Sequence, residues 1–313
     1  EEEIQTLWGV SRTTAIRSLD ELKREGYVVR QKGRGTILIP REEELKGRLV
    51  YLLMRTEGHI YHPLAESIMR NLNGEGYHTL AYDFENSNLE KRWSEILSFG
   101  GEAMVINAFD IFPFHLLDRY IQDLPFLVFV LHYENKEKEY RGGYVLSDYF
   151  QGGYLAGKHL AEKGYERLWV YTHIVKPSQI SPWDMLEGIK RGWQGEEVII
   201  CEDPEGMEEK EKIARVKEQF LARGKNCGVV CNGDFRALTI YKAIRELGWR
   251  IPEDIGITGY YNTPWCEVLH PTLTSISVRE EDIGRECARV IKERKEERVI
   301  IPPLLAERES TRR

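Results

Sequence analysis

Short, almost uninterrupted apolar runs alternate with amphipathic segments over most of the chain, and this alternation restricts its fold more than any other feature. The first run, Leu49–Met54, contains no charged residue, as expected of a strand that is buried on both faces. Further strands are predicted at 78–83, 103–106 and 126–130, and a helix at 63–72. Repeated strand–helix units predict an α/β fold with parallel sheets and right-handed crossovers.

A second series of strand–helix units begins near Asp148. Its strands are predicted at 167–171, 198–201, 228–231 and 255–259. Its helices are predicted at 154–162, around Leu186, at 208–223 and at 237–247. Two series of about 100 residues each predict two lobes, with a ligand cleft where the strand ends of the lobes face each other.

The N-terminal 40 residues follow another pattern, centred on a helix that begins after Ser11. The Ser11 hydroxyl can accept a backbone N–H bond at the start of that helix. Apolar residues recur on one helical face at Ala15, Leu19 and Leu22. Arg12, Thr13 and Arg17 lie away from that face, and arginines at a helix N-terminus suit contacts with guanine or phosphate.

A hairpin is predicted after this helix, with strands at 27–31 and 36–39. Its tip, Gly33-Arg34-Gly35, suits a path along the sugar-phosphate backbone or into the minor groove. Residues 11–40 hold seven Lys or Arg and three acidic residues, a net charge of +4, whereas the whole chain has a net charge of −7. An amphipathic helix with ordinary surface arginines is the alternative, but the cap, the arginines and the glycine-rich tip together favour DNA.

The segment from Leu7 to Ile39 resembles the winged helix-turn-helix domain of GntR-type bacterial repressors, whose signature reads GVSRTTVRxAL…EGYxxxxxGxGTFV. The resemblance implies DNA contacts from Ser11, Arg12, Thr13, Thr14, Arg17, Lys32, Gly33, Arg34 and Gly35. The family's first helix precedes the helix that contains Ile4 and Leu7. We therefore expect a winged-helix domain over residues 1–40 that lacks its first helix.

Four blocks of the larger part occur in the order found in LacI/GalR-type effector domains, which are related to periplasmic sugar-binding proteins. They lie at 145–164, 252–260, 270–276 and 302–311, and the resemblance covers about residues 48–311. It implies a dimerising, ligand-gated domain whose chain crosses the hinge near residues 146, 275 and 298. The expected arrangement is a linker at 41–48 and an effector domain at 49–313, with lobe 1 at 49–146 plus 276–298 and lobe 2 at 147–275 plus 299–313. A GntR-like DNA-binding domain joined to a LacI-like effector domain resembles the hybrid architecture of arabinose-responsive repressors.

The ligand cleft is where the sequence departs from the LacI-type pattern. Met185 replaces an arginine that grips polar ligands, and only Asp148 keeps the expected residue at its motif position. The candidate effector contacts are Tyr61, Phe109, Asp148, Trp183, Asp184, Asn232, Asp234, Tyr261 and Asn262. Aromatic faces among them suit stacking on a sugar ring or a base. The alternatives are core packing for the aromatic residues and helix capping for Asp148.

The remaining motifs argue against an enzyme. The sequence has no phosphate-binding loop, no G-x-S-x-G elbow, no H-E-x-x-H and no dinucleotide fingerprint after the first strand. The loop pair His59 and His62 is weak support for a metal site, and we expect neither a metal nor a cofactor. Five thinly spread cysteines, no signal-peptide pattern and no apolar run of about 18 residues predict a cytoplasmic protein with no membrane segment.

These features predict a ligand-responsive transcriptional regulator, a repressor that binds operator DNA as a homodimer. Its DNA affinity would depend on a small, sugar-like molecule in the cleft between the lobes. The alternative is a small-molecule binding protein or an enzyme built on the same two-lobed α/β body.

Overall fold

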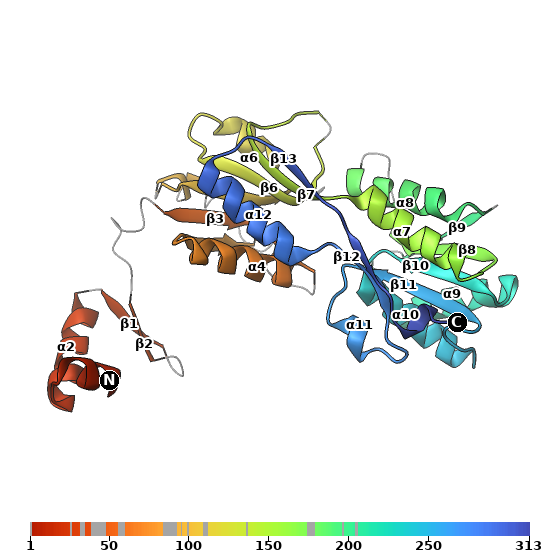
Figure 1. Cartoon of the computed structure of the whole chain (residues 1–313), viewed down its shortest axis with the longest axis horizontal. Coiled ribbons are helices and arrows are strands. Elements are labelled where there is room, and N and C mark those ends of the chain that lie inside the picture. The colour runs from red at the N-terminus through yellow and green to blue at the C-terminus, as the bar shows by residue number, and fades with distance from the viewer. Residues whose placement is uncertain are drawn as a thin grey trace.

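The computed structural model places a small helical module and two six-stranded sheets along the chain (Figure 1). It describes residues 2–25, 27–31, 35–38, 48–55, 60–83, 93–94, 96–98, 100–108, 112–135, 137–173, 179–195, 197–203 and 206–313. The predicted two-lobed α/β architecture with parallel sheets is confirmed.

The N-terminal module contains two helices and a two-stranded hairpin. Its elements are α1 (Glu2–Trp8), α2 (Arg12–Arg24), β1 (Val28–Gln31) and β2 (Gly35–Leu38). The turn between the helices needs Gly9, whose φ of +62° falls in the left-handed region. The strands are antiparallel, with Val28 opposite Leu38 and Gln31 opposite Gly35. This is the helix-turn-helix followed by a hairpin that the sequence predicts.

Lobe 1 is built on a wholly parallel sheet with the strand order β13-β7-β6-β5-β3-β4. Its strands are β3 (Leu49–Leu53), β4 (His78–Tyr82), β5 (Ala103–Ala108), β6 (Phe126–Tyr133), β7 (Gly142–Ser147) and β13 (Arg298–Ile301). Its helices are α4 (Tyr61–Gly74), α6 (Phe114–Arg119) and α12 (Glu280–Glu293). Every residue of β3 is buried, as its uncharged sequence predicts.

Lobe 2 is built on a second sheet with the order β14-β12-β11-β10-β8-β9, in which only β14 is antiparallel to its neighbour. Its strands are β8 (Arg167–Thr172), β9 (Val198–Glu202), β10 (Cys227–Cys231), β11 (Ile255–Tyr260), β12 (Thr274–Ser277) and β14 (Leu304–Ala306). Its helices are α7 (Tyr149–Glu162), α8 (Ile180–Trp193), α9 (Glu209–Arg223), α10 (Asp234–Glu246), α11 (Trp265–Val268) and the 3-10 helix η1 (Glu309–Thr311).

The chain passes between the lobes three times, and these passages form the hinge. The first lies at Asp148, between β7 and α7. The second lies at 278–279 and the third at 302–303, because β12 pairs within lobe 2 through Ser277 and β13 pairs with β7 through Ile301. Both passages therefore lie several residues beyond the expected positions 275 and 298. Residues 276–277 belong to lobe 2, and residues 299–301 belong to lobe 1.

Helices α7 and α8 pack so closely that they form one layer of lobe 2. A Cβ on Gly153 would lie 2.0 Å from the carbonyl oxygen of Met185, and a Cβ on Gly188 would lie 2.0 Å from that of Phe150. Only glycine permits such an approach of two helix backbones. A shift of α8 therefore requires a shift of α7, the helix that follows the first hinge passage.

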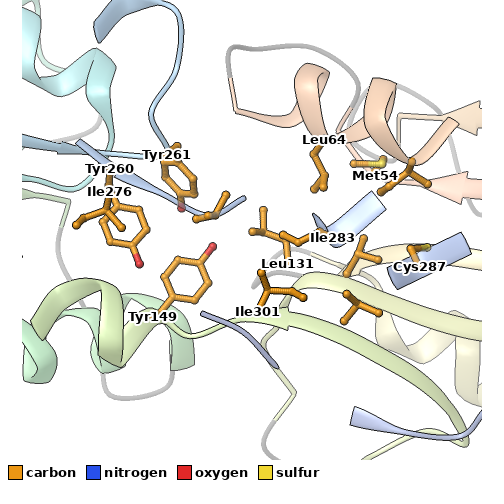
Figure 2. Close-up of a cluster of buried hydrophobic side chains, with 14 of the residues drawn as sticks. Met54, Leu64, Leu131, Tyr149, Tyr260, Tyr261, Ile276, Ile283, Cys287 and Ile301 are labelled. Atoms are coloured by element: carbon orange, nitrogen blue, oxygen red, sulfur yellow. The ribbon is translucent and has the colours of Figure 1, made fainter. Parts of the chain in front are cut away.

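One hydrophobic core continues across the hinge (Figure 2). On the side of lobe 1 it contains Met54, Leu64, Leu131, Ile283, Cys287 and Ile301. On the side of lobe 2 it contains Tyr149, Tyr260, Tyr261 and Ile276. The lobes thus meet through buried apolar side chains beside the cleft.

Candidate functional site

The first candidate site is helix α2, which presents cationic side chains on its outer face. Ser11 caps the helix, because its Oγ accepts a bond from the Thr14 backbone N at 3.2 Å. Ala15 and Leu19 are buried, whereas Arg12 and Arg17 are exposed. The helix therefore packs through its apolar stripe and leaves the arginines accessible to a polyanion.

The other predicted DNA contacts are less completely described. Thr13 and Thr14 are exposed on the first turn of α2, and the Thr14 hydroxyl lies 2.9 Å from Ser11 Oγ. Gly35 begins strand β2. Lys32, Gly33 and Arg34 lie outside the described residues, so their contribution stays a prediction.

The second candidate site is a cavity of about 280 Å³ between the lobes, called here the cleft cavity. Lobe 1 contributes Arg55, Ile60, Tyr61, His132 and Glu134, and lobe 2 contributes Tyr149, His173, Gln179, Ser181, Pro182, Met185, Asn232, Phe235, Arg236 and Tyr261. Most of these residues follow the carboxyl ends of parallel strands, where open α/β sheets bind ligands. The lining combines aromatic faces with hydrogen-bonding groups.

The wall formed by lobe 2 is held by bonds within that lobe. Asn232 follows β10 and donates from Nδ2 to Thr172 Oγ1 at 3.1 Å. Arg236 donates to the Asn232 carbonyl oxygen at 2.9 Å, and its guanidinium lies 3.0 Å from the buried carboxylate of Asp203. Lys212 balances the same carboxylate at 2.6 Å. These polar groups are therefore held in place by partners within lobe 2.

Asp234 supports this wall from beneath. Its fully buried carboxylate accepts bonds from Ser275 Oγ at 2.6 Å and from the Thr263 backbone N at 2.7 Å. Burial raises the pKa of Asp234, and the bonds from Ser275 and Thr263 oppose that shift. The carboxylate joins α10, the segment after β11, and β12 at the base of the cleft.

His132, at the end of β6, connects the wall of lobe 1 to lobe 2. Its ring stacks on Tyr149 with centroids 5.0 Å apart, and its Nε2 lies 3.2 Å from the Tyr149 hydroxyl. Its Nδ1 lies 3.3 Å from Ser181 Oγ at the start of α8. Burial lowers the pKa of His132 to about 3, so the imidazole is neutral at physiological pH. A neutral ring offers one donor and one acceptor, which matches its two hydroxyl partners.

The structure places three of the predicted effector residues, Tyr61, Asn232 and Tyr261, in the lining of the cleft cavity. Asp148 and Asp184 instead line a separate hollow beside the hinge. Asp148 caps α7, since its Oδ1 accepts the Gln151 backbone N–H at 2.8 Å, which is the alternative weighed above.

Of the other predicted effector residues, those that the structure describes do not line the cavity. Trp183 and Asp184 miss it because α8 turns Ser181 and Met185, one helical turn apart, toward the ligand space. Asp234 lies below the surface, and Asn262 donates from its backbone to Ser275 Oγ at 3.0 Å. Phe109 and the histidine of the loop pair at position 59 lie outside the described residues.

Several lining residues were not anticipated from the sequence. They are Arg55, Ile60, His132, Glu134, Tyr149, His173, Gln179, Ser181, Pro182, Phe235 and Arg236. A usable signal was present for some of them, because His132 and Glu134 come directly after the predicted strand at 126–130. Residues that follow parallel strands often line the cleft, whatever their type.

Two further findings concern metal-binding groups and membrane-spanning helices in the described part of the chain. Within it, no group of three His, Cys, Asp or Glu side chains is arranged to hold a metal ion. None of its helices combines the length and the apolar character that crossing a membrane requires.

Comparison with known families finds two matches, one in the N-terminal module and one that covers lobe 2 from within α7 onward together with α12 and β13. Residues 1–38 match the gntR family of bacterial regulatory proteins, and residues 158–311 match a periplasmic binding protein-like domain. The two parts of the chain are thus similar to two different domain families.

Two curated relatives and one solved structure illustrate these similarities. The arabinose metabolism transcriptional repressor of Halalkalibacterium halodurans is 24% identical over 344 residues, which cover 99% of this chain and 89% of the relative. The HTH-type transcriptional repressor PurR of Klebsiella pneumoniae is 29% identical over 175 residues, 53% of this chain and 51% of PurR. A LacI family transcriptional regulator from Enterococcus faecium with bound ribose has the same fold, with a TM-score of 0.69, 21% identity and coverage of 84% of this chain and 98% of that structure.

Proposed function

Because the chain joins a DNA-binding domain of the gntR family to a periplasmic binding protein-like domain, we propose that it is a ligand-responsive transcriptional repressor. The observation that carries the proposal is the presence, on one chain, of an exposed cationic helix N-terminus and a two-lobed cleft with a cavity. The arabinose repressor, which matches along nearly the whole chain, supports the same combination.

The DNA side of the proposal rests on α2. Arg12 and Arg17 enter the major groove with the start of this helix, and Thr13 and Thr14 contact phosphate or base edges. Lys32 and Arg34, at the tip of the hairpin, contact the sugar-phosphate backbone of the DNA beside that groove. The protein acts as a homodimer on a palindromic operator, because two copies of one reading helix match two half-sites.

The sensor side rests on the cleft cavity. Its volume of about 280 Å³ suits a small polyhydroxylated molecule such as a sugar. Tyr61 and Tyr261 offer aromatic faces on opposite lobes, and Asn232 offers a fixed hydrogen-bonding group. The ligand switches DNA binding only if it binds two lobe arrangements with different affinity, and coupling of about 1–3 kcal/mol is sufficient.

DNA binding by full-length variants tests the first half of the proposal. The operator is first selected from a random duplex library with the wild-type protein, and affinity is then measured by fluorescence anisotropy. The double variant Arg12→Ala, Arg17→Ala should lose roughly 100-fold or more in affinity for the selected duplex. The matched control Lys23→Ala, Arg24→Ala removes the same charge from the far end of α2 and should lose less than about tenfold. Equal losses in both variants would refute groove reading by the start of α2.

Thermal shift with L-arabinose, D-ribose and other monosaccharides tests the second half. A true effector at about 100 times its Kd should stabilise the protein by roughly 2.7 kcal/mol. The same sugar should change the anisotropy titration on the selected duplex. A sugar that raises Tm without altering DNA affinity would show ligand binding without regulation.

A further inference from the structure

Glu134 binds across the cleft to a helix of the opposite lobe. It follows β6 in lobe 1, where its backbone N donates to the Ala108 carbonyl oxygen at 2.9 Å. Its carboxylate accepts the backbone N–H of Ile180 and, at 3.0 Å, that of Ser181. Both donors belong to the first turn of α8 in lobe 2. The contact therefore joins the sheet of one lobe to a helix of the other.

Among the described residues of lobe 2, none is found to cap helix α8. Its N-cap residue, Gln179, makes no side-chain capping bond, and its first turn contains no acidic residue. Helices α2 and α7, by contrast, are capped by the residue that precedes each of them, Ser11 and Asp148. The first N–H groups of a helix require an acceptor, and a carboxylate there also interacts favourably with the helix dipole. The acceptor for α8 comes from lobe 1 and is available only when the lobes are close together.

We propose that Glu134 is a clasp that stabilises the closed arrangement of the two lobes by capping α8. His132 adds a neutral contact beside it through Ser181. Because α8 and α7 pack backbone against backbone, the clasp acts on the whole helical layer of lobe 2. A carboxylate that bonds two N–H groups is a strong interaction, yet it breaks completely when the lobes separate.

The clasp sets how the sensor responds, and this consequence rests on the proposed function. A ligand that needs closed lobes binds with an apparent Kd equal to its intrinsic Kd divided by the closed fraction. Glu134 raises that fraction before the ligand arrives. Loss of the clasp by Ile180→Pro, at a residue outside the cavity lining, should therefore weaken ligand binding.

The test measures lobe separation in the full chain without ligand. Spin labels are attached through His115→Cys on α6 and Arg191→Cys on α8, two exposed positions on different lobes. The natural cysteines are all buried, so labelling is selective. Double electron–electron resonance is recorded on labelled protein diluted with unlabelled protein, so that only distances within one chain contribute.

Two variants break the clasp from opposite ends. Glu134→Gln removes the charge, and Ile180→Pro removes one of the N–H donors while leaving the carboxylate intact. Proline is favoured at the first position of a helix, and Gln179, with φ −87° and ψ 110°, already has the conformation that precedes proline. The control Glu139→Gln alters a carboxylate of the same β6–β7 connection, whose ion pair with Arg298 stays within lobe 1.

We expect the closed-to-open ratio to fall about tenfold in each clasp variant and to stay at the wild-type value in Glu139→Gln. The double variant should open by less than the two single effects combined, because both changes weaken the same pair of hydrogen bonds. Unchanged distances in Glu134→Gln and Ile180→Pro would overturn the proposal, and so would an additive double variant. If one variant fails to fold, the other still decides. No sugar is present, so the result is independent of the proposed effector.

Discussion

The two walls of the cleft are built in opposite ways. On the side of lobe 2, Asn232 and Arg236 are bonded to partners of the same lobe, and the fully buried Asp234 anchors the segments below them. On the side of lobe 1, the side chains of His132 and Glu134 bond to residues of lobe 2. Lobe 2 is therefore the preformed half of the site. The side-chain bonds made by lobe 1 form only when the two lobes are close together.

This difference has a measurable consequence for substitutions. Changes in the wall of lobe 2 should lower the stability of that lobe whether or not the lobes are closed. Changes in the wall of lobe 1 should act mainly on closure and ligand affinity. The predictions that follow test this division.

The largest effect on stability should come from Asp234→Ala. It removes a buried carboxylate and leaves the Ser275 hydroxyl and the Thr263 N–H without their acceptor, which should cost about 3 kcal/mol. Urea unfolding followed by circular dichroism gives the free energy of unfolding. Asp184→Ala removes an exposed carboxylate from α8 and should stay within about 0.5 kcal/mol of wild type. Equal losses would mean that Asp234 is not an anchor.

The next effect should appear as a pH dependence caused by His132. Burial lowers its pKa in the folded state to about 3, below the unfolded value near 6.5, so the unfolded chain binds the proton more readily. The wild type should therefore lose about 2 kcal/mol relative to His132→Gln as the pH falls from 7 to 5, and nothing further should be gained above pH 7. Urea unfolding at several pH values measures this change in the free energy of unfolding. His62→Gln, at an exposed position of α4, should run parallel to wild type, and a parallel curve for His132→Gln would contradict burial of a neutral ring.

The sequence predicted the architecture well because the features that specify it are local. The uncharged run at β3 and its successors carry the signal of buried parallel strands in a few consecutive residues each. The predicted hinge passages were less accurate than the predicted strands, because the pattern of apolar residues does not show at which residue a strand ends. β12 keeps pairing through Ser277 and β13 through Ile301, and both lie beyond the expected passages.

The cleft was only partly predicted, for two physical reasons. Trp183 and Asp184 lie next to Met185, the position at which the family has an arginine, but the rotation of α8 turns Ser181 and Met185 toward the cavity. Glu134 was missed because its partners lie in another lobe, 46 and 47 residues along the chain. Contacts between the lobes depend on how the lobes are placed relative to each other, and the spacing of residues along the sequence does not show this.

A smaller effect should separate two neighbouring tyrosines of the core that crosses the hinge. Tyr149→Phe removes the hydroxyl that contacts Nε2 of His132 and should cost about 1 kcal/mol. Tyr260→Phe should be neutral or slightly stabilising, because the buried Tyr260 hydroxyl has no hydrogen-bond partner among the described residues. Both rings are stacked 5.7 Å apart, so the pair is matched in burial and packing. Urea unfolding of the two variants measures the difference, and equal values would remove the link between the lobes through Tyr149 and His132.

The smallest effect on stability should come from Tyr61→Leu in the wall of lobe 1. The ring is half-buried and lies 5.9 Å from the Arg55 guanidinium, a contact worth about 0.5 kcal/mol at such a site. The free energy of unfolding should therefore change little, while affinity for an effector that stacks on Tyr61 should fall roughly fivefold to tenfold, measured by isothermal titration calorimetry. A loss of stability as large as that of Asp234→Ala would show that the wall of lobe 1 is also a structural anchor. In that case the division between a preformed wall and a closing wall would not hold.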